Sequence, residues 1–177
     1  MTIKVDSNLT TTSAYIELFK LDFSILSGLY GGVGLPILYL TPSGVNADNT
    51  PISFDGNQYI PYPVQVTGLA SVSDGAPPRP ILDIANVDKL IGMYTFIYGD
   101  VVGASVTYIR TYASYLGISS SISAPPLKFT IARKISHTQA SISFELRTPL
   151  DKERSFLPAR QMLKKDFPGL GLNKTIR

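Results

Sequence analysis

The sequence predicts a mainly β fold, either a barrel or a two-sheet sandwich, with one α-helix packed against it. Apolar residues alternate with polar ones along several segments of the 177-residue chain, which is typical of half-buried strands. Clusters of Gly, Pro, Asn, Asp and Ser separate these segments, as expected for turns between strands. Only one segment shows a strong apolar stripe at helical spacing.

The clearest strands lie in the second half of the chain. At residues 140–146, Ala140, Ile142, Phe144 and Leu146 should face the core, while Ser and Glu residues face the other way. Residues 127–131 alternate in the same manner, and a connection at 134–139 would make the two segments a hairpin. Further strands are expected at 19–23, at 102–108 with Val102, Ala104, Val106 and Tyr108 on one face, and from weaker patterns at 36–40, 52–54, 59–66 and 81–84.

One helix is expected at about residues 86–98. Asn86 can cap its N-terminus, or Asp88 can do so if the helix starts slightly later. Six residues then form one stripe that should pack on the sheet: Val87, Leu90, Ile91, Tyr94, Ile97 and Tyr98.

The two ends of the chain are expected to be arms on a single domain: an N-terminal arm at 1–13, a β domain at 14–161 and a C-terminal arm at 162–177. A short helix should start near Leu157, because Pro158 is tolerated in a first helical turn. The C-terminal arm mixes apolar and cationic residues with glycines, too irregularly for a core of its own. We therefore expect it to form a subunit interface through Phe167, Leu170, Leu172, Lys174, Ile176 and Arg177.

The composition indicates a protein whose surface is partly covered by other subunits. The chain is 44% hydrophobic and only 16% charged, against about 25% charged residues in typical soluble domains. Charge is also divided unevenly: residues 1–109 hold four basic and nine acidic residues, and residues 110–177 hold twelve and four. Such a division suits electrostatic docking between subunits or a nucleic-acid surface. Arg133 and Lys134 could contact phosphates, but the basic residues are too dispersed for nucleic-acid readout.

No membrane insertion is expected. The uncharged stretch at residues 23–47 is long enough to span a bilayer, but its many Gly and Pro residues interrupt a helix. The N-terminus also lacks the apolar stretch of a signal peptide.

No catalytic, cofactor or metal site is expected, and the chain is therefore predicted not to be an enzyme. There is no cysteine, and the single histidine, His137, falls in the predicted hairpin turn as a solvated residue. The glycine-rich stretch 28–34 lacks the P-loop pattern and is better explained as a flexible turn. Asp83 and Asp88 could form a hydrolytic pair, although helix capping and a strand-end charge explain them more simply.

Six segments carry a more specific signal, in this order along the chain: AYIELFKLD (14–22), ISFDGNQYIPYP (52–63), PRPILDIANVD (78–88), DVVGASVT (100–107), FELRTPLD (144–151) and LPARQ (157–161). Each is similar to a stretch of one family, such as its F-x-G-x-x-Y-x-P-Y-P pattern. From about residue 14 to 161 the chain thus resembles the minor tail protein L family of lambda-like long-tailed (siphovirus) phages.

The resemblance implies a tail-tube-like β domain in a ring of the virion tail tip or baseplate, assembled in the host cytoplasm. The ring would join the distal tail protein to the central tail hub protein and line the channel through which DNA passes as cargo. Six copies are favoured, with three as the alternative. The family usually continues into a cysteine-bearing extension that looks like an iron–sulfur site, and this cysteine-free sequence cannot supply the thiolate ligands.

Two other functions remain open at this stage. A receptor- or carbohydrate-binding β-sandwich of a virion would need aromatic residues at a groove or loop end, whereas here most lie in the predicted strands and helix. A small tail-tip hydrolase would need a catalytic constellation, which the sequence does not suggest.

We predict that the protein holds no iron–sulfur cluster and no structural zinc, because it has no cysteine and one histidine. Metal analysis of protein purified without an affinity tag should find neither metal in stoichiometric amount. Stoichiometric iron with visible absorption would contradict the prediction.

Overall fold

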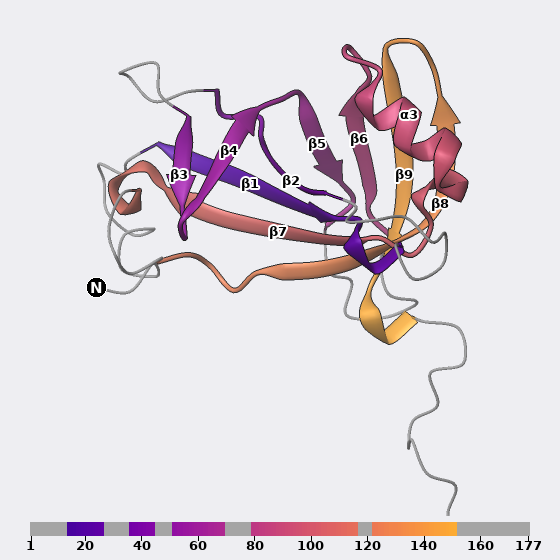
Figure 1. Ribbon diagram of the computed structural model, residues 1–177. Helices are drawn as coiled ribbons and strands as arrows, with labels where there is room; N and C mark the ends of the chain where they lie inside the picture. Colours follow the sequence, from indigo (N-terminus) through magenta and orange to yellow (C-terminus); the bar gives the residue numbers. More distant parts are fainter. Residues whose placement is uncertain (1–13, 27–35, 45–50, 70–78, 117–121, 152–177) are drawn as a thin grey trace, which may run out of the picture.

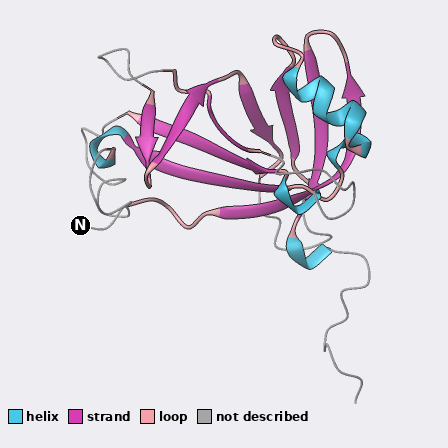
Figure 2. Ribbon diagram, in the orientation of Figure 1, coloured by secondary structure: helices cyan, strands magenta, loops and turns pink. Residues whose placement is uncertain are grey.

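The computed structural model describes residues 14–26, 36–44, 51–69, 79–116 and 122–151 (Figure 1). Strands dominate these residues, as predicted (Figure 2). The expected N-terminal arm, the glycine-rich stretch 28–34, the short helix near Leu157 and the C-terminal arm lie outside them.

The described elements are nine strands, one α-helix and four short 3-10 turns. The strands are β1 (Tyr15–Asp22), β2 (Ile37–Thr41), β3 (Ile52–Phe54), β4 (Asn57–Pro61), β5 (Val64–Thr67), β6 (Ile81–Ala85), β7 (Ser105–Tyr112), β8 (Leu127–His137) and β9 (Ser141–Arg147). The helix is α3 (Leu90–Ile97), and the turns are η1 (Ser24–Leu26), η2 (Gly99–Val101), η3 (Ala113–Tyr115) and η4 (Pro149–Asp151).

The strands form one sheet in the order β3-β4-β2-β1-β7-β8-β9-β6-β5. This sheet bends at two corners, and the first lies within β8. Residues Leu127–Thr130 of β8 pair with β7, whereas the part from Thr130 to His137 pairs with β9. The register with β9 shifts between Ile131 and Arg133 and again between Lys134 and Ser136. Such irregularities increase the bend and twist of a strand, so β8 can serve both halves of the sheet (Figure 1).

The second corner lies at Tyr62 and Pro63, between β4 and β5. On one side, β4 pairs with β2, and the Tyr62 N–H donates to the carbonyl of Thr41 at 2.9 Å. On the other side, β5 pairs with β6, and the carbonyl of Pro63 accepts from the Ala85 N–H at 2.9 Å. This short stretch therefore links the β2 side of the sheet to the β6 side, and the curved sheet wraps around its core.

The core is filled by the alternating apolar residues of both halves of the sheet. It draws on β1, β2, β5, β6, β7, β8, β9 and α3, and its fully covered side chains include Phe19, Leu21, Leu82, Ile142, Phe144 and Leu146. The opposite face of β1 contributes Ile16 and Leu18 to a smaller cluster with Ile52, Phe54 and Tyr59 from the β3–β4 hairpin. β1 is thus buried on both faces, which explains why it carries more apolar residues than a half-buried strand needs.

Several strand boundaries differ from the sequence prediction, and three of the differences move expected core or turn residues. β8 continues to His137, so the expected connection at 134–139 shrinks to residues 138–140, and Ala140 is exposed instead of facing the core. Val102 is also exposed, because β7 begins only at Ser105. The strand expected at 59–66 is divided by the corner at Tyr62 and Pro63.

The helix begins later than predicted and presents a narrower face to the core. Its N-cap is Lys89, with a left-handed φ of 54° and no capping side chain. Ile91 and Thr95 are buried and Tyr94 and Tyr98 pack against the core, whereas the other predicted stripe residues, Val87, Leu90 and Ile97, are exposed.

Asn86 still serves the helix N-terminus, but from outside the helix. Its side chain is buried, and its Oδ1 accepts the N–H of Gly92 at 3.2 Å while its Nδ2 donates to the carbonyl of Thr138 at 3.2 Å. A capping residue normally satisfies one of the first helical N–H groups from the adjacent position. Here the same bond ties the helix to the β8–β9 turn, because Asn86 is also anchored to Thr138.

Replacing Ile91 with Ala should destabilise the protein by about 2–5 kcal/mol, since Ile91 is 1% exposed and its loss leaves a cavity. The matched change Leu90→Ala should cost less than about 1 kcal/mol, because Leu90 is 38% exposed. Equilibrium unfolding in denaturant measures both. Equal losses would mean that the helix packs through a different face.

Candidate functional site

The residues considered for catalysis do not converge. The Nε2 atom of His137 lies 3.5 Å from the Asn86 amide, and the nearest partner of Asp83 is the Ser143 hydroxyl, which donates to it. Within the described ranges, no carboxylate forms a hydrogen bond or ion pair with His137. Among the described residues, no group of three or more His, Cys, Asp or Glu side chains could hold a metal ion. In that same part of the chain, no helix is long and apolar enough to cross a membrane.

The most unusual surface is the outward side of α3. Leu90, Met93, Phe96 and Ile97 are all exposed, and Phe96 is 90% exposed. Water is an unfavourable neighbour for so many apolar side chains on one short helix, and contiguous apolar patches commonly mark protein contacts. We call these four residues the α3 face.

A hollow of about 640 Å³ lies beside the α3 face. It is lined by α3, by the residues before the helix and by the β8–β9 turn: Asn86, Lys89, Gly92, Met93, Phe96, His137, Thr138 and Gln139. Gly92 lies close to two side chains of this lining: a Cβ there would lie 3.0 Å from Asn86 Oδ1 and 3.3 Å from His137 Nε2, closer than most Cβ contacts. Sequence reasoning identified Asn86 and His137 singly but not their meeting at Gly92.

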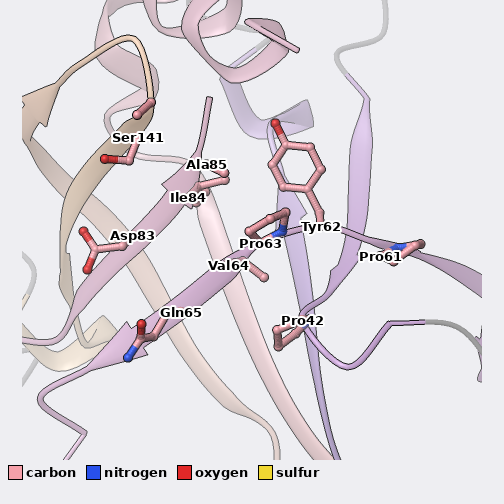
Figure 3. Close-up of a pocket in the computed structure, with 11 residues that line it drawn as sticks. Pro42, Pro61, Tyr62, Pro63, Val64, Gln65, Asp83, Ile84, Ala85 and Ser141 are labelled. Carbon is pink, nitrogen blue, oxygen red and sulfur yellow. The ribbon is translucent and has the colours of Figure 1, made fainter. Parts of the chain in front are cut away.

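A second groove of about 640 Å³ follows the corner at Tyr62 and Pro63 (Figure 3). Gln65, Asp83 and Ser141 lie along one side of it, and Pro42 and Pro61 lie along the other. We call it the proline groove; its full lining is Pro42, Pro61, Tyr62, Pro63, Val64, Gln65, Asp83, Ile84, Ala85, Ala140 and Ser141.

The Tyr62 hydroxyl lies in a desolvated position in this corner. Burial raises the pKa of Tyr62, and the negative charge of Asp88 raises it further. The phenol therefore stays neutral at physiological pH.

Ion pairs occupy the outer face of the sheet near β6, β8 and β9. Glu145, whose side chain is only 9% exposed, pairs with Arg133 and with Arg79 at 3.1 Å, and Arg79 also reaches Asp151 at 3.2 Å. The hydrogen bond from Arg133 is the main reason that the pKa of Glu145 is lowered, with Arg79 contributing. Arg133 and Lys134 are two of the basic residues considered as phosphate contacts, and Lys134 pairs with Asp100. Both cations are therefore already matched by carboxylates.

Comparison with known proteins gives this architecture a family. Residues 33–168 match the family described as phage minor tail protein L. The chain belongs to this family. Its six resembling segments and its mainly β fold are thus explained by common descent, and the minor tail protein L assignment made from the sequence is confirmed.

Two relatives illustrate the extent of the similarity. The chain is 29% identical over 163 residues to the tail tip protein L of Escherichia phage lambda, covering 85% of this chain and 66% of that protein. It also shares its fold with a chain of the native gene transfer agent virion, with a TM-score of 0.55 and 17% identity over 87% of this chain and 47% of the other. The chain thus spans somewhat less than two thirds of its lambda relative and about half of the solved one.

The predicted interface residues of the C-terminal arm, from Phe167 to Arg177, lie outside the described residues of this minor tail protein L member. The α3 face and the two hollows were not predicted as sites. In a sequence, exposed apolar residues at helical spacing cannot be distinguished from core residues. Only the packing of α3 in the structure shows which of them are exposed.

Replacing Glu145 with Gln should make the free energy of unfolding less dependent on pH in the acidic range. The folded state lowers the pKa of Glu145 below its ordinary 4.5, so the ion pairs stabilise the protein above that pH. Their contribution is lost as pH falls through the folded pKa, and the difference in unfolding free energy between wild type and E145Q, about 0.5–1 kcal/mol, should vanish there. Urea unfolding at pH 7 and pH 3 tests this.

Combining E145Q with Arg133→Gln controls for the loss of other contacts. If the pair is responsible, the second substitution should add little to the first. Identical pH profiles for wild type and E145Q would contradict the assignment.

Proposed function

We propose that this chain is a structural ring subunit of a phage tail tip or baseplate. It joins the distal tail protein to the central tail hub protein and lines the channel through which DNA passes. Six copies form the ring in this proposal, with three as the alternative. Membership of the minor tail protein L family and the likeness to a lambda tail tip protein support it.

The single observation that carries the proposal is the α3 face. A free monomer would leave Met93, Phe96 and their neighbours in water, whereas a tail protein packed against them removes that apolar surface. The low charged fraction of the chain points the same way, because subunits of assemblies need fewer solubilising charges than free proteins.

Ring formation also needs two different surfaces on each subunit. A head-to-tail contact joins one patch to a different patch on the next copy, and rotational symmetry closes the ring. We assign one of these surfaces to the C-terminal arm, through the apolar and cationic residues Phe167, Leu170, Leu172, Lys174, Ile176 and Arg177.

The test is a particle experiment. A phage lacking the gene should fail to complete its tails, and supplying the chain should restore infectious particles with density for this fold at the tail tip in electron microscopy. A protein that stays monomeric, binds glycans and never enters particles would overturn the proposal in favour of a receptor-binding module.

Phe96→Ser should reduce incorporation into particles at least about tenfold without destabilising the free chain, because the side chain is exposed in the monomer and would be buried in the tail. Ile60→Ser, on β4, is the matched control: it also removes an exposed apolar side chain and should leave incorporation unchanged. Quantitative immunoblots of purified particles measure both. Equal incorporation of the two variants would show that the α3 face is not an interface.

A further inference from the structure

A free strand edge borders the proline groove. β5 is the last strand of the sheet, and within the described ranges only β6 pairs with it. The carbonyl of Pro63 accepts from Ala85, and in an antiparallel ladder the bonding direction alternates from residue to residue. The backbone groups of Val64 and Val66 therefore point away from β6, where an extended segment can pair with them.

The chemistry of the groove favours an apolar segment that carries positive charge. Prolines, Tyr62 and Val64 supply apolar surface, and Asp83 is the one charged residue of the lining. A second carboxylate, Asp88, is close enough to act on the Tyr62 hydroxyl. No cation is among the lining residues of this groove, whereas the hollow beside α3 includes Lys89.

The chain itself contains a segment of this chemistry. Residues 167–177 carry two cations, Lys174 and Arg177, no carboxylate side chain, and four large apolar residues at Phe167, Leu170, Leu172 and Ile176. Opposite charge favours the proline groove over the hollow beside α3 for such a segment, because Lys89 would repel it.

The positions of the segment and the groove suit a contact between copies. Asp151, the last described residue, pairs with Arg79 just before β6 begins, whereas the groove lies at the other end of β6, at Asp83–Ala85. About 16 residues separate Asp151 from Phe167 and can span about 50 Å when extended. A chain that continues from Asp151 of one subunit can reach the groove at the opposite end of β6 in the next subunit. Such a contact between two different surfaces is a head-to-tail contact.

We propose that the proline groove of each subunit holds residues 167–177 of a neighbouring copy, which pairs with the free edge of β5. The inference rests on the proposed ring and names the contact that joins its subunits.

Cross-linking tests the contact directly, because the 177-residue chain has no cysteine of its own. A Gln65→Cys chain is mixed with an affinity-tagged Leu170→Cys chain and oxidised, and tagged–untagged dimers are quantified on non-reducing gels. The Ile25→Cys chain replaces Gln65→Cys as the matched control, because Ile25 is exposed and lies in neither the proline groove nor the α3 face. The groove pair should give at least about tenfold more mixed dimer, because binding raises the effective concentration of the two thiols.

Charge supplies the second measurement. Adding Lys174→Gln and Arg177→Gln to the tagged chain should lower the yield of mixed dimer several-fold, and raising the salt concentration should do the same. Equal yields for the Gln65 and Ile25 pairs, or no mixed dimer at all, would overturn the proposal. A Gln65→Cys/Leu170→Cys double variant that closes only within one chain would overturn it as well.

Incorporation into particles, measured on the same reduced variants, separates this contact from the tail-tip function. Chains that enter particles without cross-linking contradict only the groove assignment. Chains that cross-link but never enter particles contradict the tail-tip role.

Discussion

The fold depends on one constraint: a single sheet must turn two sharp corners to cover its own apolar face. At one corner β8 changes partner from β7 to β9, and its two register shifts absorb the bend. At the other, Tyr62 bonds to β2 while Pro63 bonds to β6, so two adjacent residues connect the two sides of the sheet. Without either corner, Phe19 and Leu21 of β1 would not meet the inward residues of β6 and β9 in one core.

The corners also determine where the surfaces lie. The chain leaves the sheet at Ala85 and returns at Ser105, and between these points α3 packs Ile91 on the core while Asn86 fastens the start of the helix to Thr138 in the β8–β9 turn. Because Gly92 has no side chain, Asn86 and His137 can approach the helix closely, while Met93 and Phe96 remain exposed. The proline groove exists because β5 departs from the direction of β4 at Pro63, which opens space between Pro42 and Gln65.

Much of the fold could be predicted from the sequence, since alternation at residues 127–131 and 142–146 requires only local pattern. The extension of β8 to His137 could not, because residues 134–137 lack an apolar face and their pairing depends on register shifts against β9. The start of α3 was misplaced because Asn86 divides its hydrogen bonds between Gly92 and Thr138, and the second partner is distant in sequence. The proline groove could not be predicted for the same reason, because its lining comes from separate segments that include Pro42, Tyr62, Asp83 and Ser141.

The short free edge of β5 also affects how the chain meets other strands. An unpaired strand edge can join the edge of any other chain, and long regular edges grow into aggregates. The Tyr62 N–H is already bonded to the carbonyl of Thr41, so a foreign strand that pairs with Val64 and Val66 finds no continuous ladder beyond the corner. The chain thus keeps a short edge that pairs best with a partner whose side chains match the groove and offers few backbone hydrogen bonds to a nonspecific strand.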